Sequence, residues 1–463
     1  MPTPTRVLTF LLSCMFLLPL SGEAWPQQLD PAFSGDGWLT EGFQPVAGQE
    51  FDIALAACAV SDGRLLVTGL ASGGRRVVTL RLLEDGSLDP TFSGDGKESF
   101  DLIEPAVSLH STPTQAVCTA DGRPVIAYTS MVSRRMQIVV LRVALTGLPD
   151  ASFGLQGRVL PRISPQSDLE VPTAMVVSSE GIELGARVGL PSLGPFGGVV
   201  RLSAEGAVRR TALLYFFEGV PSPSSITAIG LFGREPPFDR VELILAGPSS
   251  YSQPDEPTLV VLRADPANLA VYDFASHANF DLRVIGRGRA VSAEALALGV
   301  GVHRGAHVRP ALVSIRRSDL SAQLVAFDRP MPIDGFDSDV DQTPMGIEAI
   351  PLPDGRPALI AGMGWSGTQG QVRGVFFGVV RDGAPDTSVG LGGGWLTPMA
   401  SQVCLGQGAP DLRFRRATVW NGRPTFVGGV RAAPCGTDSL NYDYWVARMR
   451  PLPPPPMFAD GFE

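Results

Sequence analysis

Short apolar runs, separated by polar turn residues, recur along most of the chain. In the first well-formed group, apolar residues dominate Ile53 to Val60, Leu65 to Gly69 and Val77 to Leu83. An Asp62-Gly63 pair separates the first two runs, and Gly94-Asp95-Gly96 follows the third. Because tight hairpin turns need the positive φ that glycine adopts readily, the pattern predicts four short antiparallel strands.

The same group returns at intervals of about 60 residues, and regular repetition indicates a repeat architecture. The segment Leu29 to Gly37 recurs almost unchanged as Leu88 to Gly96, and a weaker copy begins at Leu148. The fifth copy, around Ala295 to Arg316, is shortened. Each of seven copies contains an apolar run that closes on an arginine, namely Arg81, Arg142, Arg201, Arg263, Arg316, Arg381 and Arg448.

A unit of this size cannot bury both faces of its sheet alone, so neighbouring units must stack, and radial closure removes exposed sheet edges. The last unit stops at its third strand, Tyr444 to Arg450. The chain begins with an unaccompanied fourth strand, Leu29 to Leu39. We therefore predict an all-β fold, a seven-bladed β-propeller of four-stranded blades in which the N-terminal strand completes the last blade and closes the ring.

Composition and charge agree with a compact protein that does not bind nucleic acid. Hydrophobic residues make up 44% of the 463 residues, enough for a large core. The chain carries 37 Lys and Arg against 46 Asp and Glu, a net charge of −9. Because nucleic acids and anionic membranes attract basic surfaces, this balance disfavours both as partners.

The first 24 residues have the form of a signal peptide. Arg6 precedes an apolar stretch from Val7 to Leu20, and Gly22-Glu23-Ala24 provides a small-residue cleavage site. We predict a secreted or periplasmic protein with no transmembrane segment, in which residues 25–450 form the propeller. Residues 451–463 would be a proline-rich tail that ends in Phe458-Ala-Asp-Gly-Phe-Glu463.

Four cysteines remain after residue 24, and an even number in an oxidising compartment favours disulfides. We predict that Cys404 and Cys435 pair, because their two loops should emerge on the same face of neighbouring blades. The pairing of Cys58 and Cys118 stays open, since their side chains could point to opposite faces of their sheets. Zinc is disfavoured, because no Cys-x-x-Cys pair is present and the histidines lie elsewhere. We also expect no other metal and no cofactor.

The turn Asp62-Gly63-Arg64, the run that closes on Arg81 and the segment Leu88 to Gly96 together resemble the delta-60 repeat family. Asp62 to Gly96 is the best match, and the resemblance extends over most of the chain after residue 24. It implies an exported bacterial repeat protein with propeller-like units, and it carries over no catalytic residues.

The first strand of every unit contains an alanine, as expected where strands crowd a central channel. The preceding residues point the other way, and three of them are charged: Glu294, Glu348 and Arg416. Two carboxylates beside a cation could perform acid–base chemistry on a sugar, so a hydrolase or lyase using Glu294 and Glu348 is one hypothesis. A polar, water-filled channel explains the same residues, and we favour that interpretation.

The leading functional hypothesis is therefore an exported, non-enzymatic binding or scaffold protein, expected to be a monomer. Its partner would be an extracellular or envelope protein or a glycan of unknown identity. The loops between second and third strands differ in every unit, and such loops on a rigid scaffold often carry recognition. Four of these loops contain an aromatic residue suited to a contact, namely Phe196, Tyr251, Trp365 and Tyr442.

Overall fold

The fold is known from a computed structural model. It describes residues 29–43, 52–107, 114–214, 223–232, 242–249, 258–277, 280, 282–304, 307–327, 342–352, 354–367, 370–389, 394–398, 412–431 and 442–451. Within these ranges nearly all regular structure is β-strand, and the helical element is one 3-10 turn at Thr387–Val389. The all-β prediction is confirmed.

The strands follow one another in antiparallel groups, each built as a meander of four strands, and the sixth group has a fifth strand of two residues. The first two groups comprise β2 (Ile53–Ala59), β3 (Leu65–Ala71), β4 (Arg76–Leu82), β5 (Lys97–Asp101), β6 (Gln115–Cys118), β7 (Pro124–Val132), β8 (Arg135–Arg142) and β9 (Arg158–Val159). The next two comprise β10 (Leu169–Ser178), β11 (Gly181–Leu190), β12 (Gly194–Leu202), β13 (Val208–Leu214), β14 (Ala228–Phe232), β15 (Glu242–Ser249), β16 (Thr258–Ala264) and β17 (Val271–His277). Then come β18 (Leu282–Ala290), β19 (Ala295–Arg304), β20 (His307–Arg316), β21 (Ala322–Ala326), β22 (Gln342–Pro351), β23 (Pro357–Gly367), β24 (Gly370–Arg381), β25 (Ala384–Pro385) and β26 (Gly394–Pro398).

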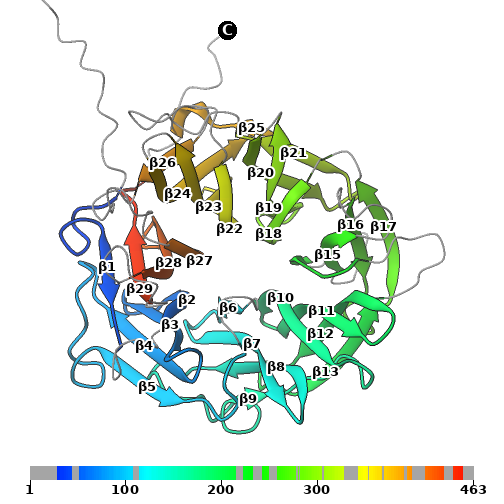
Figure 1. Cartoon of the computed structure of the whole chain (residues 1–463), viewed down its shortest axis with the longest axis horizontal. Coiled ribbons are helices and arrows are strands. Elements are labelled where there is room, and N and C mark those ends of the chain that lie inside the picture. Colours follow the sequence, from blue (N-terminus) through cyan, green and yellow to red (C-terminus); the bar gives the residue numbers. More distant parts are fainter. Residues whose placement is uncertain are drawn as a thin grey trace, which may run out of the picture.

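The last group combines both ends of the described chain. Its strands are β27 (Leu412–Trp420), β28 (Arg423–Arg431) and β29 (Tyr442–Arg448), and β1 (Trp38–Glu41) is the fourth. β1 pairs antiparallel with β29, in a register from Trp38 opposite Ala447 to Glu41 opposite Tyr444. Figure 1 shows the groups arranged radially, with β1 beside β29.

The first strands of the groups lie innermost and contact one another in succession, and β27 in turn contacts β2. Backbone pairing also continues between groups. Innermost strands pair at Ala228 with Gly288 and at Arg287 with Glu348, whereas β10 pairs with the third strand of the preceding group, β8, at Leu169 with Met136. As a result, the second and third groups share one curled eight-stranded sheet, and the fourth to sixth share a sheet of thirteen strands. This differs from the separate four-stranded blades that the sequence predicts.

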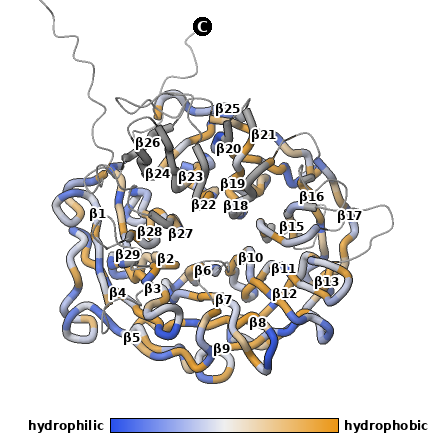
Figure 2. The backbone as a smooth tube through the Cα atoms, viewed as in Figure 1, coloured by the Kyte–Doolittle hydropathy of each residue, from blue (hydrophilic) through white to orange (hydrophobic). Residues whose placement is uncertain are grey.

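Apolar clusters fill the spaces between consecutive groups. Leu66 of the first group packs in one cluster with Ile126 of the second. Val67 packs in another with Trp420 and Val446, which belong to the last group. In Figure 2 the hydrophobic segments follow the strands, while hydrophilic segments are frequent in the connecting turns. Each sheet therefore buries both of its faces against its neighbours, as the repeat requires.

Three features that recur in the repeat form one ion cluster: the arginine of the Asp-Gly-Arg turn, the arginine at the end of the third strand, and the aspartate of Leu-Asp-Pro. Arg64, from the Asp-Gly-Arg turn, and Arg81, at the end of the third strand, lie 2.5 and 2.8 Å from the same Asp89 oxygen. Burial raises the pKa of Asp89, but hydrogen bonds from Thr91 and the two guanidinium charges outweigh this effect and lower it. Three further clusters have the same form: Asp150 with Arg123 and Arg142, Asp386 with Arg356 and Arg381, and Asp30 with Arg423 and Arg448.

The fifth group is complete, which corrects the shortened unit predicted from Ala295. Its innermost strand is β18, so Ala295 begins the second strand rather than lying in the first. The small residue at the crowded position is Gly288, where an added Cβ would come 2.4 Å from the Ala297 carbonyl oxygen and 2.7 Å from the Ala228 Cβ. The space requirement was predicted correctly, but glycine meets it here in place of alanine.

Candidate functional site

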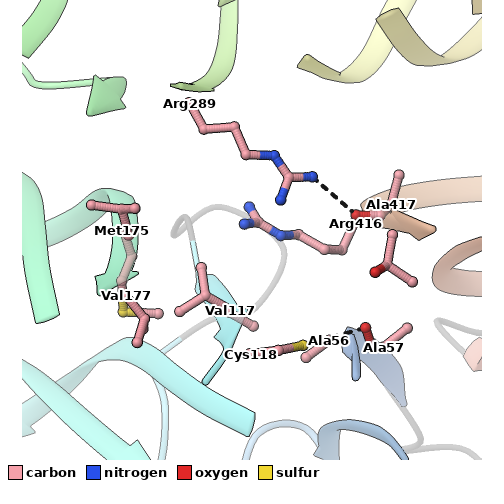
Figure 3. Close-up of a pocket in the computed structure, with 12 residues that line it drawn as sticks. Ala56, Ala57, Val117, Cys118, Met175, Val177, Arg289, Arg416 and Ala417 are labelled. Carbon is pink, nitrogen blue, oxygen red and sulfur yellow. Dashed lines mark hydrogen bonds between the residues drawn. The ribbon is translucent and has the colours of Figure 1, made fainter. Parts of the chain in front are cut away.

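The innermost strands line a partly open cavity of about 160 Å³ at the centre of the molecule. Five of them contribute to its wall: β2, β6, β10, β18 and β27. Figure 3 shows the side chains of Arg289, from β18, and Arg416, from β27, extending into this space from different directions. The cavity is thus built from parts of the chain that are far apart in sequence, which the radial arrangement of the strands brings together.

The two arginines share one buried carboxylate. The Arg416 Nη1 lies 3.0 Å from the Glu348 Oε1, and the Arg289 Nη2 lies 3.5 Å from the same oxygen. The Ala417 amide donates to the other oxygen, Glu348 Oε2, at 2.9 Å. Arg289 also donates from Nε to the Ala349 carbonyl and from Nη2 to the Ala417 carbonyl, both at 3.3 Å. These contacts fix both guanidinium groups at the cavity wall.

This cluster contains two positive charges and one negative charge. The Glu348 side chain is only 2% exposed, whereas the Arg289 side chain is 29% exposed, on the side that faces the cavity. Burial lowers the pKa of Arg289 to about 10, with the charge of Arg416 acting in the same direction and that of Glu348 opposing it. Arg289 therefore stays charged at neutral pH, and the three side chains present a net positive charge in a poorly solvated place.

The rest of the wall is almost entirely apolar. It is formed by the small or aliphatic side chains of β2, β6 and β10, with Thr418 as the one side-chain hydroxyl among the residues that line the cavity. Those apolar residues are Ala56, Ala57, Ala116, Val117, Met175, Val176 and Val177. The arrangement places a cationic group opposite a hydrophobic surface, which suits an anion with an apolar part.

Cys58 and Cys118 form a disulfide that joins β2 to β6 at this wall, with 5.4 Å between the Cα atoms. The sequence left this pair open, on the ground that the two side chains could point to opposite sheet faces. In stacked sheets, opposite faces of neighbouring units are the ones that meet, so this orientation favours the bond. Cys404 and Cys435, the pair that the sequence did predict, lie outside the described residues.

The structure does not bring Glu294 and Glu348 together. Glu294 lies in the turn between β18 and β19 and is exposed, whereas Glu348 lies inside β22 and is 1% exposed. The expected carboxylate pair depended on placing Ala295 in an innermost strand, which is wrong. Arg416 does line the central cavity, as the sequence analysis expected for its position.

Arg289 is the site residue that sequence reasoning missed. It comes before β19, which sequence reasoning took as the first strand of the fifth unit. It lies within Gly286-Arg-Gly-Arg289, where the glycines interrupt the apolar pattern expected of a strand. A signal was present, because a unit length of about 60 residues calls for an innermost strand near residue 288. The spacing between repeats could have identified it.

The structure places the four aromatic residues proposed for binding in different environments or leaves them undescribed. Phe196 is 8% exposed, because the hairpin is tighter than expected and places it in β12, opposite Val188 of β11. It packs between the second and third groups, which corrects its assignment to an open loop. Tyr251 lies outside the described residues. Trp365 lies in β23 and Tyr442 begins β29, but the structure does not describe their side chains, so their role stays a prediction.

Fold and repeats identify a β-propeller, and a comparison with protein families agrees. Residues 61–92 match a family described as "domain of unknown function (DUF5122) beta-propeller". No curated protein sequence matches the chain. None of the described residues forms a helix with the length and hydrophobicity that a membrane span needs.

Several solved structures are similar over most of their length. They include the polysaccharide lyase Uly1 (11% identity, TM-score 0.43, covering 88% of this chain and 91% of that one). The β-propeller domain of Nup133 from Vanderwaltozyma polyspora has 10% identity and a TM-score of 0.41, with coverage of 88% and 99%. A GH93 α-L-arabinofuranosidase of Fusarium graminearum, in complex with arabinobiose, has 10% identity and a TM-score of 0.38, with coverage of 89% and 97%. At these scores, the similarities carry no argument about function.

Proposed function

We propose that this protein is an exported, seven-bladed β-propeller that binds a small anion in its central cavity. The observation that carries the proposal is the pair Arg289 and Arg416, which share the single carboxylate of Glu348 at the cavity wall. A desolvated positive charge is costly unless a negative charge accompanies it, so a bound anion would complete the site.

A closed ring of seven blades is supported by contacts that repeat from group to group. Arg142 donates to the Ala204 carbonyl of the next group, and Arg201 donates to the Pro266 carbonyl of the one after. Arg448, near the end of the chain, donates in the same way to the Glu84 carbonyl of the first group. The arginine of the last group thus donates to the first group as those of the second and third groups donate to their successors. The pairing of β1 with β29 completes the last group with a strand from the start of the described chain.

Export is supported by the Cys58–Cys118 disulfide, because disulfides persist mainly in oxidising compartments. Export also agrees with our interpretation of residues 1–24 as a signal peptide. We propose that residues 25–450 form the propeller.

Binding is favoured over acid–base catalysis by the state of Glu348. Both of its oxygens are engaged, one by two arginines and the other by a backbone amide. Glu348 also stands behind the wall rather than among the residues that line the cavity. A general acid or base must reach the proton that it transfers, and this carboxylate is positioned instead to orient the two arginines.

The proposal can be tested by thermal unfolding in increasing sodium acetate. A ligand that binds only the folded state raises the melting temperature by an amount that grows with the logarithm of its concentration relative to Kd. We expect acetate to stabilise the wild type more than Arg289→Met, in which the cluster becomes neutral. Arg316→Met is the matched control, since the Arg316 side chain is 66% exposed and outside the cavity wall. Equal acetate responses in all three proteins would refute a central anion site.

A further inference from the structure

We infer that the ligand of the central cavity is a monocarboxylate with a compact apolar body. This inference rests on the proposed function and adds the chemical class of the anion. It follows from three properties of the site: the charge at the arginine cluster, the shape of the guanidinium groups, and the composition and size of the opposite wall.

The charge favours a monoanion. Arg289 and Arg416 together carry two positive charges, and Glu348 neutralises one of them. A single carboxylate brings the cluster to neutrality. Sulfate carries −2 and phosphate carries between −1 and −2 at neutral pH, so sulfate, and phosphate unless it binds in its −1 form, would leave excess negative charge in a poorly solvated space.

The shape of the donors favours a planar carboxylate. A guanidinium group offers N–H donors in one rigid plane, and two such groups side by side can each donate to one oxygen of a planar carboxylate. The bonds of Arg289 to the described part of the chain use Nε and Nη2. Nη1 is not among these donors, and Figure 3 shows this guanidinium directed into the cavity beside that of Arg416. The ligand carboxylate would lie between the two groups.

The opposite wall determines the remainder of the ligand. Val117, Met175 and Val177 face the arginines across the cavity and offer no hydrogen-bonding group other than backbone (Figure 3). A sugar acid of similar size would leave several hydroxyl groups without partners, which weakens binding. A volume of about 160 Å³ is close to that of an apolar cavity of about 150 Å³ that holds benzene, and this cavity is partly open, so a ligand with a phenyl-sized body fits.

The test is calorimetric titration of the full-length protein with probes of matched size. We choose 3-phenylpropionate as the apolar monocarboxylate, glucuronate as the polar one, 3-phenylpropanol as the neutral analogue, and inorganic phosphate. We expect 3-phenylpropionate to bind one to one, at least about tenfold more tightly than any other probe. Arg289→Met should weaken its binding at least tenfold, since a charge-assisted bond is lost. Arg316→Met should leave its binding unchanged.

A second variant separates the apolar contribution from the charge. Val177→Thr keeps the shape of the side chain and adds a hydroxyl group to the wall. It should weaken 3-phenylpropionate several-fold and leave the acetate response of the melting temperature unchanged. If Arg289→Met does not fold, Arg289→Lys retains the charge but lacks the planar donors, and it should still weaken 3-phenylpropionate.

The possible outcomes distinguish the inference from the proposed function. If glucuronate or phosphate binds at least as tightly as 3-phenylpropionate and depends on Arg289, the ligand class is wrong and the anion site stands. If 3-phenylpropanol binds as tightly as 3-phenylpropionate, the carboxylate is not recognised and the inference fails. If no probe depends on Arg289 and acetate gives no Arg289-dependent stabilisation, both the inference and the proposed function fail.

Discussion

Removal of the Cys58–Cys118 disulfide should destabilise the protein markedly, because this bond joins two blades. The perturbation is the double variant Cys58→Ala/Cys118→Ala. The two residues are 60 positions apart, and closing a loop of that length lowers the entropy of the unfolded chain by an amount worth about 4 kcal/mol. A chain of 463 residues has a large unfolding entropy, so this corresponds to a decrease of roughly 4 °C in melting temperature.

The assay is thermal and guanidinium unfolding of the wild type and the double variant, each with and without a reductant. The wild type should lose stability on reduction by about as much as the substitutions remove. A Cys404→Ala/Cys435→Ala variant removes the pair that the sequence predicts, so this pair cannot contribute to the effect of the reductant. Non-reducing peptide mapping identifies the bonded residues directly. The reasoning is refuted if the double variant unfolds like the wild type, or if folded protein yields free Cys58 and Cys118.

Three further predictions concern the blades. Burial raises the pKa of Glu183 to about 7, so the folded state favours the protonated carboxyl group. Its contribution to the free energy of unfolding is therefore complete below about pH 4.5 and is lost as pH rises through 7. Between pH 5 and 8 the wild type should therefore lose up to about 3 kcal/mol relative to Glu183→Gln, measured by urea unfolding. Asp89→Ala should lower the free energy of unfolding, measured in urea, by about 2–4 kcal/mol, because two arginines lose their shared partner. The control Asp95→Ala, at an exposed residue, should lower it by less than about 1 kcal/mol. Gly288→Ala should lower the free energy of unfolding by about 1–3 kcal/mol, because the added methyl group would clash with β19 and with Ala228 of the neighbouring inner strand. An unchanged melting temperature would contradict the close approach of the strands at this position.

The repeat made most of the architecture predictable from the sequence. The Asp-Gly-Arg turn, the arginine that ends the third strand and the aspartate of Leu-Asp-Pro are far apart within a unit. The structure brings them into one cluster, as at Asp89, which explains why these three markers recur together. The N-terminal strand beside the last blade was predictable for a similar reason, because its sequence copies the fourth strand of the first complete unit.

The central site was much less predictable, because it depends on contacts between units. Arg289 lies in a glycine-rich innermost strand that has Gly288 at the position where the other units have alanine, so pattern matching aligned the fifth unit to the wrong strand. That error placed Glu294 beside Glu348, although Glu294 lies in an exposed turn. Phe196 shows the same limit at a hairpin, where the sequence does not reveal how far two strands extend before they turn.

The most direct test of the central site is a bromide soak of crystals of the wild-type protein, followed by anomalous diffraction. Bromide is a monoanion, and its anomalous scattering locates it whatever the natural ligand is. We predict a bromide site in the cavity, in contact with the guanidinium groups of Arg289 and Arg416, that disappears in Arg289→Met crystals. Bromide bound only at surface arginines such as Arg316, with none in the cavity, would contradict the account.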